Sequence, residues 1–161
     1  MEQLALDVCC GSRMMWFDKQ DERAVFVDKR NESHILCDDR VLNITPNIQA
    51  DFTALPFADE TFYIVAFDPP HLVNVGDNSW LAKKYGKLQN DWQDDLAKGF
   101  SECFRVLKPN GILVFKWNEN QVPVKTILAL SKRPPLFGHT TMRHRKGKNG
   151  YATHWFTFLK D

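Results

Sequence analysis

One stretch, residues 62–72, constrains the fold more than any other part of the chain. Its first six residues are apolar and mostly aromatic or β-branched, as in strands that are buried on both faces of a sheet. Asp68 then precedes Pro69 and Pro70, which have no N–H group to donate, so strand pairing must end there. Because ligands of open α/β sheets bind at the carboxyl ends of the strands, Asp68 and His71 are predicted to lie at a binding site.

The length and composition indicate a single domain over residues 1–161. A chain of 161 residues with 43% hydrophobic and 25% charged residues can bury a core and is not expected to be disordered. No apolar run approaches the roughly 20 residues that span a bilayer. The first strand candidate begins at Leu4, too early for a secretory leader. A cytoplasmic location without membrane contact is therefore expected.

The cysteines and histidines do not indicate a metal site. Four cysteines form neither a CxxC pair nor an evenly spaced framework, so we expect reduced thiols. His34 and Cys37 have a gap typical of zinc ligands, but no second pair accompanies them. Zinc is therefore the weaker alternative, and no bound metal is expected.

Apolar periodicity predicts strands that alternate with helices. Besides the central run, strands are expected at residues 4–8, 24–27, 47–51, 112–117, 136–140 and 152–159. Helices are expected from Arg13 onward, over residues 91–107 and over residues 123–130. Residues 31–46 form either a loop or a small hairpin, and residues 75–89 form either a lid or an exposed connection. The pattern indicates an α/β fold with a three-layer, doubly wound, mostly parallel sheet and an antiparallel carboxyl-terminal hairpin.

The carboxyl-terminal region is strongly basic, although the whole chain has a net charge of only +1. Residues 120–160 contain eight basic residues and no acidic one, whereas the other 13 basic residues and all 20 acidic residues lie elsewhere. Four of the eight are at the tip of the expected hairpin: Arg143, Arg145, Lys146 and Lys148. The asymmetry favours a polyanionic partner that binds through the hairpin, with a solvated basic loop as an equally weighted alternative.

Three further acids follow predicted strands: Asp7, Asp28 and Asp51. Asp28 comes about 20 residues after the first loop, the spacing at which an acid meets ribose hydroxyls in nucleotide-binding sheets. Surface acids are also common at strand ends, so the spacing alone does not assign a role.

The combination of motifs resembles the class I S-adenosylmethionine-dependent methyltransferases. Its most specific parts are residues 51–62, which run into Asp68-Pro69-Pro70, and the Leu-Lys-Pro-Asn-Gly turn at residues 107–111 before an apolar strand. The resemblance extends over residues 4–117 and, more weakly, over the final hairpin. It implies that S-adenosylmethionine is the cofactor.

The resemblance also implies which residues bind the cofactor. In this family the first loop holds the methionine part, the acid equivalent to Asp28 accepts from the ribose, and the pair equivalent to Asp51 and Phe52 holds the adenine. The implied set is Asp7, Cys9, Cys10, Gly11, Asp28, Asp51, Phe52 and Asp68. Cys9 and Arg13 stand where the family loop, acid-x-Gly-x-Gly-x-Gly, has its outer glycines. These substitutions weigh more against a nicotinamide oxidoreductase than against a methyltransferase, because a dinucleotide needs the glycines to admit its pyrophosphate.

The form Asp-Pro-Pro-aromatic resembles methyltransferases that modify amino nitrogens, including N6 of adenine in DNA or RNA. In the implied mechanism the Asp68 carboxylate and the Pro69 carbonyl hold the two amine hydrogens and turn the nitrogen lone pair toward the methyl group. Pro70 and His71 complete the implied catalytic set, and His71 stands where the family has Tyr, Phe or Trp. His71 can stack on a base, donate to the substrate or accept its proton, and capping the strand end is the structural alternative.

The predicted function is therefore methyl transfer to an amino nitrogen, with RNA or DNA as the partner of the basic hairpin. The chain has no extra region for duplex recognition, so an unpaired base demands least of the protein. Two alternatives remain open. One is a methyltransferase of a small metabolite or a protein side chain, and the other is a catalytically silent nucleic-acid-binding module.

Overall fold

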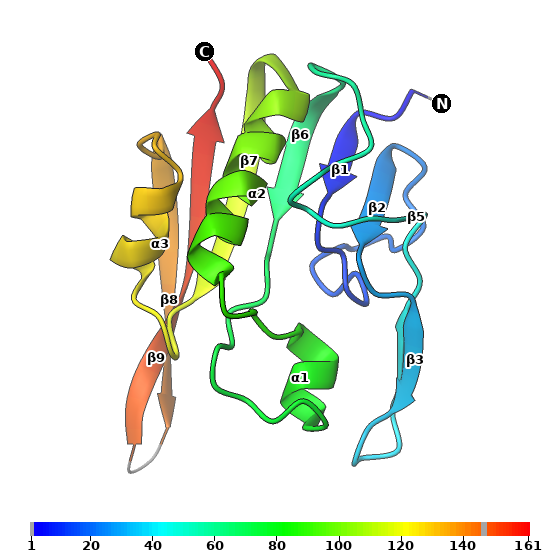
Figure 1. Cartoon of the computed structure of the whole chain (residues 1–161), viewed down its shortest axis with the longest axis vertical. Helices are drawn as coiled ribbons and strands as arrows, with labels where there is room; N and C mark the ends of the chain where they lie inside the picture. The colour runs from blue at the N-terminus through cyan, green and yellow to red at the C-terminus, as the bar shows by residue number, and fades with distance from the viewer. Residues whose placement is uncertain (1, 146–147) are drawn as a thin grey trace.

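One mostly parallel sheet of seven strands organises the computed structural model, which describes residues 2–145 and 148–161, without the side chains of residues 144, 145, 148 and 149 (Figure 1). The strand order is β5-β2-β1-β6-β7-β9-β8. The strands are β1 (Ala5–Asp7), β2 (Ala24–Asp28), β5 (Ile48–Gln49), β6 (Phe62–Phe67), β7 (Leu107–Asn118), β8 (Phe137–Arg145) and β9 (Lys148–Leu159). In this order the strands from β5 to β7 are parallel, and β9 is antiparallel to β7 and β8. The predicted parallel sheet with an antiparallel terminal hairpin is confirmed.

Strand β6 lies at the centre of the sheet, as its apolar sequence predicts. It pairs in parallel with β1 on one side and with β7 on the other. Its last residue, Phe67, is buried and packs edge-on against Phe100 of helix α2 (Trp92–Val106), with ring centroids 5.3 Å apart. The strand ends at Phe67, so Asp68 and His71 lie at the carboxyl edge of the parallel strands.

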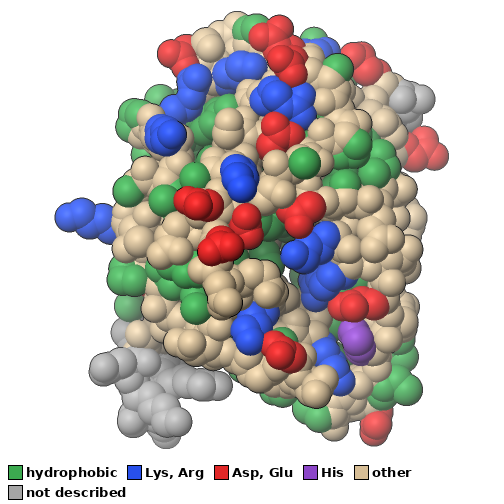
Figure 2. All heavy atoms as spheres, viewed as in Figure 1, with side chains coloured by type: hydrophobic (Ala, Val, Ile, Leu, Met, Phe, Trp, Pro, Cys, Tyr) green, Lys and Arg blue, Asp and Glu red, His purple; other side chains and the backbone are tan. Residues whose placement is uncertain are grey.

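Two helices cover one face of the sheet. Helix α2 buries Leu96 and Phe100 in the core that β6 and β7 share, and helix α3 (Val124–Leu130) adds Ile127 to the same core. Each fully buried Leu, Ile or Phe contributes about 1.5–3 kcal/mol relative to its exposed state. Both helices confirm the predicted ones to within a few residues. Acidic and basic side chains intermix on the face that the helices cover (Figure 2).

Within residues 9–23, all of them described, no helix forms where one was expected from Arg13 onward. The segment consists of turns in which Gly11 and Arg13 have positive φ angles of 49° and 57°. The Arg13 guanidinium donates to the backbone carbonyl of Thr45, at 2.8 Å, and lies over the Phe26 ring. The helix prediction is wrong because these distant contacts hold the segment in an irregular path.

The second face of the sheet is covered only in part by the described residues. Trp16 packs on Phe26 of β2, with ring centroids 4.9 Å apart, so a loop forms the layer over β1 and β2. Farther along, the paired residues Ile64, Ile112 and Leu159 share this face and are 37–45% exposed. The face is therefore open over β6, β7 and β9.

The two segments with more than one interpretation both contain regular structure. Residues 31–46 form an antiparallel hairpin of β3 (Glu32–Ile35) and β4 (Val41–Ile44), which confirms one of the two alternatives. Residues 75–89 contain helix α1 (Trp80–Tyr85), which lies beyond the carboxyl ends of the strands (Figure 1). Helix α1 is therefore on the side of the sheet where a ligand is expected.

Candidate active site

Two cavities meet at the carboxyl end of β6. The first has a volume of about 230 Å³ and the second of about 420 Å³. Four residues line both of them: Cys9, Arg30, Asp68 and Tyr85. Asp68 thus lies at the junction of two potential ligand sites.

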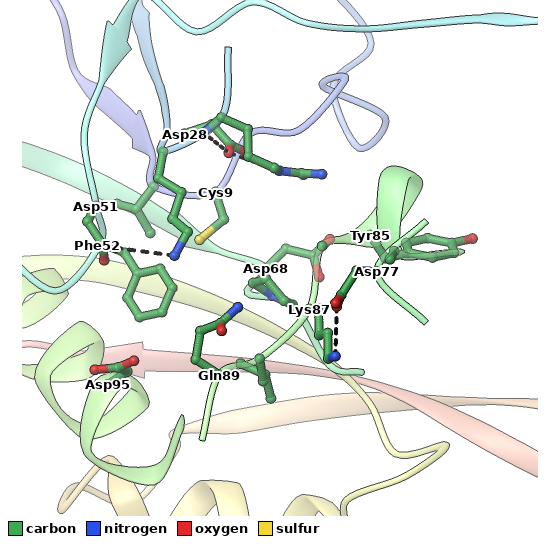
Figure 3. Close-up of a pocket in the computed structure, with 17 residues that line it drawn as sticks. Cys9, Asp28, Asp51, Phe52, Asp68, Asp77, Tyr85, Lys87, Gln89 and Asp95 are labelled. Atoms are coloured by element: carbon green, nitrogen blue, oxygen red, sulfur yellow. Dashed lines mark hydrogen bonds and ion pairs between the residues drawn. The ribbon is translucent and has the colours of Figure 1, made fainter. Parts of the chain in front are cut away.

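The first cavity brings together acids from three strand ends. Asp28 ends β2, Asp51 follows β5 and Asp68 follows β6, and all three line this cavity (Figure 3). Cys9 and Phe52 line it as well. The three other residues of the implied cofactor set line the second cavity instead: Asp7, Cys10 and Gly11.

Asp28 ties the loop after β1 to the end of β2. Its Oδ2 atom accepts a hydrogen bond from the backbone N–H of Gly11, and its Oδ1 atom accepts one from the backbone N–H of Arg30, both at 2.9 Å. Gly11 has a φ of 49°, which glycine adopts with the least strain. A carboxylate offers about four lone-pair sites, so Asp28 keeps acceptor capacity for a ligand hydroxyl.

Asp51 and Phe52 place a charged acceptor next to an apolar ring. Asp51 accepts hydrogen bonds from the backbone and the hydroxyl of Thr53, and Lys29 Nζ lies 3.6 Å from its second oxygen. Partial burial favours a higher pKa for Asp51, but these partners together lower the pKa and keep the side chain ionised at neutral pH. The Phe52 ring packs edge-on against Phe67, with centroids 5.4 Å apart.

Asp7 is the most deeply buried acid of the site, with an exposure of 1%. It accepts hydrogen bonds from Trp16 Nε1 at 2.7 Å and from the backbone N–H of Cys9 at 3.2 Å. Burial raises the pKa of Asp7 to about 7, although the two hydrogen bonds oppose the rise. Asp7 therefore exchanges a proton near neutral pH while it holds the turn after β1.

Asp68 is paired with a lysine of the neighbouring strand. Lys116 lies on β7, and its Nζ atom is 2.6 Å from Asp68 Oδ2. Burial raises the pKa of Asp68, and the Lys116 ammonium partly offsets that rise. Each side chain is 29% exposed, so a substrate in the second cavity can reach the pair.

His71 lies in the second cavity beside two aromatic rings. The distance between ring centroids is 5.3 Å to Tyr85 and 6.3 Å to Trp117. Burial, with a smaller effect of the Lys116 charge, lowers the pKa of His71 to about 4. The imidazole is neutral near pH 7, which suits contact with another flat ring and makes His71 a weak proton acceptor.

Helix α1 and the residues after it pack against the Asp-Pro-Pro-His motif. Gly86 ends the helix with φ 75° and ψ 177°, a conformation almost restricted to glycine, and a Cβ there would lie 2.9 Å from Pro70 Cγ. The Leu88 N–H donates to the Leu72 carbonyl at 2.8 Å. Since Tyr85 lines both cavities, the segment forms a wall that the two cavities share.

Neither a protein-family model nor a curated protein sequence matches this chain. Several solved structures, in contrast, match this chain. An S-adenosylmethionine-dependent methyltransferase from Methanosarcina mazei matches over 99% of this chain and 94% of its own, at 12% identity and a TM-score of 0.58. The 1,6-didemethyltoxoflavin-N1-methyltransferase of Burkholderia thailandensis, solved with 1,6-didemethyltoxoflavin and S-adenosylhomocysteine, matches over 98% and 70%, at 12% identity and a TM-score of 0.56. The cyclase SpnF matches over 97% and 73%, at 12% identity and a TM-score of 0.59.

The chain has the fold of the S-adenosylmethionine-dependent methyltransferases. At these identities the likeness establishes the fold, and the cyclase shows that this fold serves other chemistry too. Among the residues that the structure describes, no helix is long and apolar enough to cross a membrane. Within the same residues, no group of three or more His, Cys, Asp or Glu side chains is placed to hold a metal ion.

On this methyltransferase fold, the basic residues predicted to contact a substrate are placed only in part. Arg143 is exposed and lines the second cavity together with Tyr151. Arg145 and Lys148 pair in the backbone ladder of β8 and β9, but their side chains are not described. Lys146 lies outside the described residues. Arg143 is thus the one member of the predicted set whose side chain is placed at the site within the described part of the chain.

Two charged residues of this site were missed by the sequence analysis. The signal for Lys116 is that it is the only charged residue in the apolar run 112–117. Arg30 gives no comparable signal. Its Nε atom lies 3.3 Å from Asp28 Oδ1, and its Nη1 atom donates at 2.9 Å to the carbonyl of Lys83 in helix α1. Arg30 therefore connects the end of β2 to the wall over the cavities.

Proposed function

We propose that this protein transfers a methyl group from S-adenosylmethionine to an amino nitrogen of a nucleic-acid base. The observation that carries the proposal is the position of Asp68, which lines both cavities and directly precedes two prolines and His71. A donor held in the first cavity and an acceptor held in the second would meet beside this residue. Such positioning can supply much of the rate enhancement of a bimolecular transfer.

The lining of the first cavity fits S-adenosylmethionine in chemical terms. Asp28 and Asp51 offer acceptors for hydroxyl and amino hydrogens, and Phe52 offers an apolar ring. Asp28 and Asp68 line the same cavity, and their carboxylates would favour a ligand that carries a positive charge. When bound, the cofactor supplies an electrophilic methyl group, whose S–C bond breaks as the acceptor nitrogen forms its new N–C bond.

The motif residues prepare the acceptor. An exocyclic amine is a poor nucleophile because its lone pair is delocalised into the ring. The Asp68 carboxylate and the Pro69 carbonyl can accept its two N–H groups and so direct the lone pair toward the first cavity. Lys116 occupies Oδ2 of Asp68, which leaves Oδ1 for the amine. The fixed φ angles of Pro69 and Pro70 keep both acceptors in place.

Asp68 is also the better proton acceptor of the two candidates. The nitrogen must lose one proton after it gains the methyl group. Because burial raises the pKa of Asp68, its carboxylate is a stronger base than that of an exposed aspartate. His71, with a pKa of about 4, is a weak base, and its neutral ring serves instead as a stacking surface for the acceptor.

The second cavity favours a flat acceptor that is attached to a polyanion. Aromatic rings of Trp80, Tyr85 and Tyr151 line it, together with the cationic side chains of Lys84 and Arg143. Aromatic rings stack on unpaired bases, and lysine and arginine pair with phosphates. The excess of basic residues in the carboxyl-terminal region supports the same class of partner.

Cofactor binding is tested by calorimetric titration of S-adenosylhomocysteine into the wild type and Asp28→Asn. Asp38→Asn is the matched control, because Asp38 also binds the arginine two residues later but is exposed and lines neither cavity. We expect the wild type and the control to bind, and Asp28→Asn to bind at least about tenfold more weakly, a change of about 1.4 kcal/mol. If the wild type does not bind, the cofactor assignment is wrong.

Methyl transfer is tested with labelled cofactor and separate fractions of cellular RNA, DNA, protein and small molecules. We expect label in a nucleic acid, recovered as an N-methylated base after digestion, and no label with Asp68→Asn. Label in the small-molecule or protein fraction alone would contradict the nucleic-acid acceptor. Cofactor binding without label in any fraction would instead favour the catalytically silent module.

A further inference from the structure

Strands β7, β9 and β8 present a row of polar and aromatic side chains on the open face of the sheet. Strand pairing places Lys116 opposite Trp155, and Trp155 opposite His139. Two residues nearer the carboxyl end of β7, Asn118 pairs with Thr153, which also pairs with Thr141. Two residues further along the hairpin, Tyr151 pairs with Arg143. We call this set the strand-binding face: Lys116, Asn118, His139, Thr141, Arg143, Tyr151, Thr153 and Trp155.

The alternation of side chains along each strand separates this face from the core. Directly paired residues point to the same side of a sheet, and successive residues point to opposite sides. On β7, Phe115 and Trp117 are buried in the core beneath the helices, and Phe158 of β9 is buried in the same core. The strand-binding face is therefore on the side opposite α2 and α3, and none of its eight residues is acidic.

The strand-binding face is continuous with the second cavity. Five of its eight residues also line that cavity: Lys116, Asn118, Arg143, Tyr151 and Thr153. Lys116 joins the two, because its ammonium contacts Asp68 and lies 5.4 Å from the centroid of the Trp155 ring. A molecule that lies along the face therefore reaches the reacting position at Asp68.

The side chains of this face have the chemistry of a surface that binds single strands. His139 and Arg143 are exposed, and Tyr151 and Trp155 are half-buried, so each can be contacted from solvent. Flat rings stack on unpaired bases, and cations pair with the phosphates between them. Thr141, Thr153 and Asn118 lie among these rings and cations and offer donors and acceptors to a ribose 2′-hydroxyl.

We propose that the strand-binding face holds an unpaired RNA strand and delivers one of its bases to the second cavity. This inference rests on the proposed methyl transfer for the fate of the base, but the binding itself requires no cofactor. Unpaired RNA is favoured over duplex because stacking on a sheet needs splayed bases. RNA is favoured over DNA because of the hydroxyl and amide groups of the face.

The test is fluorescence anisotropy of a labelled single-stranded RNA dodecamer that contains adenines, titrated with the full chain in the absence of cofactor. His139→Ala and Arg143→Ala remove exposed side chains, so they are expected to fold. Each should weaken binding at least about fivefold, since His139→Ala removes a ring on which a base can stack, a contact of about 1–3 kcal/mol, and Arg143→Ala removes a cation that pairs with phosphate. Two variants away from the face should change the affinity for RNA less than twofold. They are Lys125→Ala on α3 and Tyr63→Ala, which is at the end of β6 far from Asp68.

Equal binding by all four variants would overturn the strand-binding face, whether or not the protein methylates RNA. DNA of the same sequence, or duplex RNA, that binds as tightly as the single-stranded RNA would overturn the choice of ligand. Failure of the proposed function looks different: S-adenosylhomocysteine does not bind or no base is methylated, while RNA binding still depends on His139 and Arg143. Weaker RNA binding confined to the two face variants supports the inference.

Discussion

The Nζ atom of Lys116 lies 2.6 Å from Oδ2 of Asp68, so the acid at the junction of the two cavities carries its own counter-ion. The lysine belongs to β7 and the aspartate follows β6, and these strands are parallel neighbours. The pair leaves one carboxylate oxygen for a substrate and opposes the rise in the pKa of Asp68 that burial causes. Lys116 is therefore expected to control the pH range in which Asp68 is ionised.

Replacing Lys116 with methionine should shift the acid side of the pH–rate profile to higher pH. Without the ammonium the pKa of Asp68 rises further, so the carboxylate is protonated over a wider range and transfer at neutral pH falls. An opposite charge at this distance typically changes a pKa by about 1–3 units, so we expect a shift of about one pH unit or more.

Lys108→Met is the matched control, because Lys108 lies on the same strand at its other end and contacts the Tyr63 ring. Lys116→Arg should restore most of the profile, since it keeps the charge. An unchanged profile in Lys116→Met would show that the ion pair has no part in setting the ionisation of Asp68.

Asp7 should make the protein less stable as the pH rises toward neutrality. Its pKa is about 7 in the folded state and 3.8 as the reference value, so between these values the folded protein binds a proton that the unfolded chain has released. The contribution of this proton to the free energy of unfolding is fully present below pH 3.8, and it is lost as the pH rises through about 7. Across pH 5 to 7 the unfolding free energy should fall by about 1 kcal/mol or more from this group.

Asp7→Asn isolates that contribution. The variant loses one hydrogen-bond acceptor at all pH values, but it has no ionisation at this position. Chemical denaturation at several pH values should show the stability difference moving in favour of Asp7→Asn as the pH rises. A constant difference from pH 5 to 8 would contradict the raised pKa.

His71→Phe should retain methyl transfer, whereas His71→Ala should slow it at low substrate concentration, because the substrate binds more weakly. The imidazole is already neutral at pH 7, because its pKa is about 4, and it lies 5.3 Å from the Tyr85 ring between centroids. Loss of a stacked ring should raise KM about fivefold or more. If His71→Phe abolishes turnover without affecting KM, His71 acts through its nitrogens rather than as a stacking surface.

Gly86→Ala should impair both ligand sites, since the new Cβ would lie 2.9 Å from Pro70 Cγ at a backbone conformation that suits only glycine. Such a backbone position costs about 1–3 kcal/mol for other residues. Gly76→Ala in the same segment is the control, because a Cβ at that position would have no neighbouring atom within 4 Å. Equal affinities of the two variants for S-adenosylhomocysteine would argue against a role for this wall.

The parts of the fold that depend on local sequence could be predicted. Strand β6 follows from its apolar run, and α2 follows from apolar residues at three- and four-residue steps. Arg13 shows where local reasoning ends: a helix suits its neighbourhood, but contacts with Thr45 and Phe26 hold it at a positive φ. Strands β8 and β9 extend beyond their predicted bounds, because polar residues on the open face weaken the apolar pattern.

The candidate site likewise has residues that could be predicted from the sequence and residues that could not. Asp28, Asp51 and Asp68 could be predicted to lie together, because the carboxyl ends of parallel strands share one edge. Lys116 could not be assigned a role, because its partner Asp68 is 48 residues away in the chain. The local pairing of Arg30 with Asp28 likewise does not indicate its hydrogen bond to Lys83, which is 53 residues away. Such pairings follow from the register of the sheet and from the path of the loops, which a single sequence does not reveal.

Tyr85 and Asp68 belong to the walls of both cavities, so neither cavity can be filled without touching a surface of the other. Two ligands that adjust a common wall change each other's affinity. Thermodynamic linkage requires that both affinities change by the same factor. In the proposed reaction, a donor that has lost its methyl group would contact that wall differently from one side. The protein thus has a route by which completing the reaction can alter its hold on the modified acceptor.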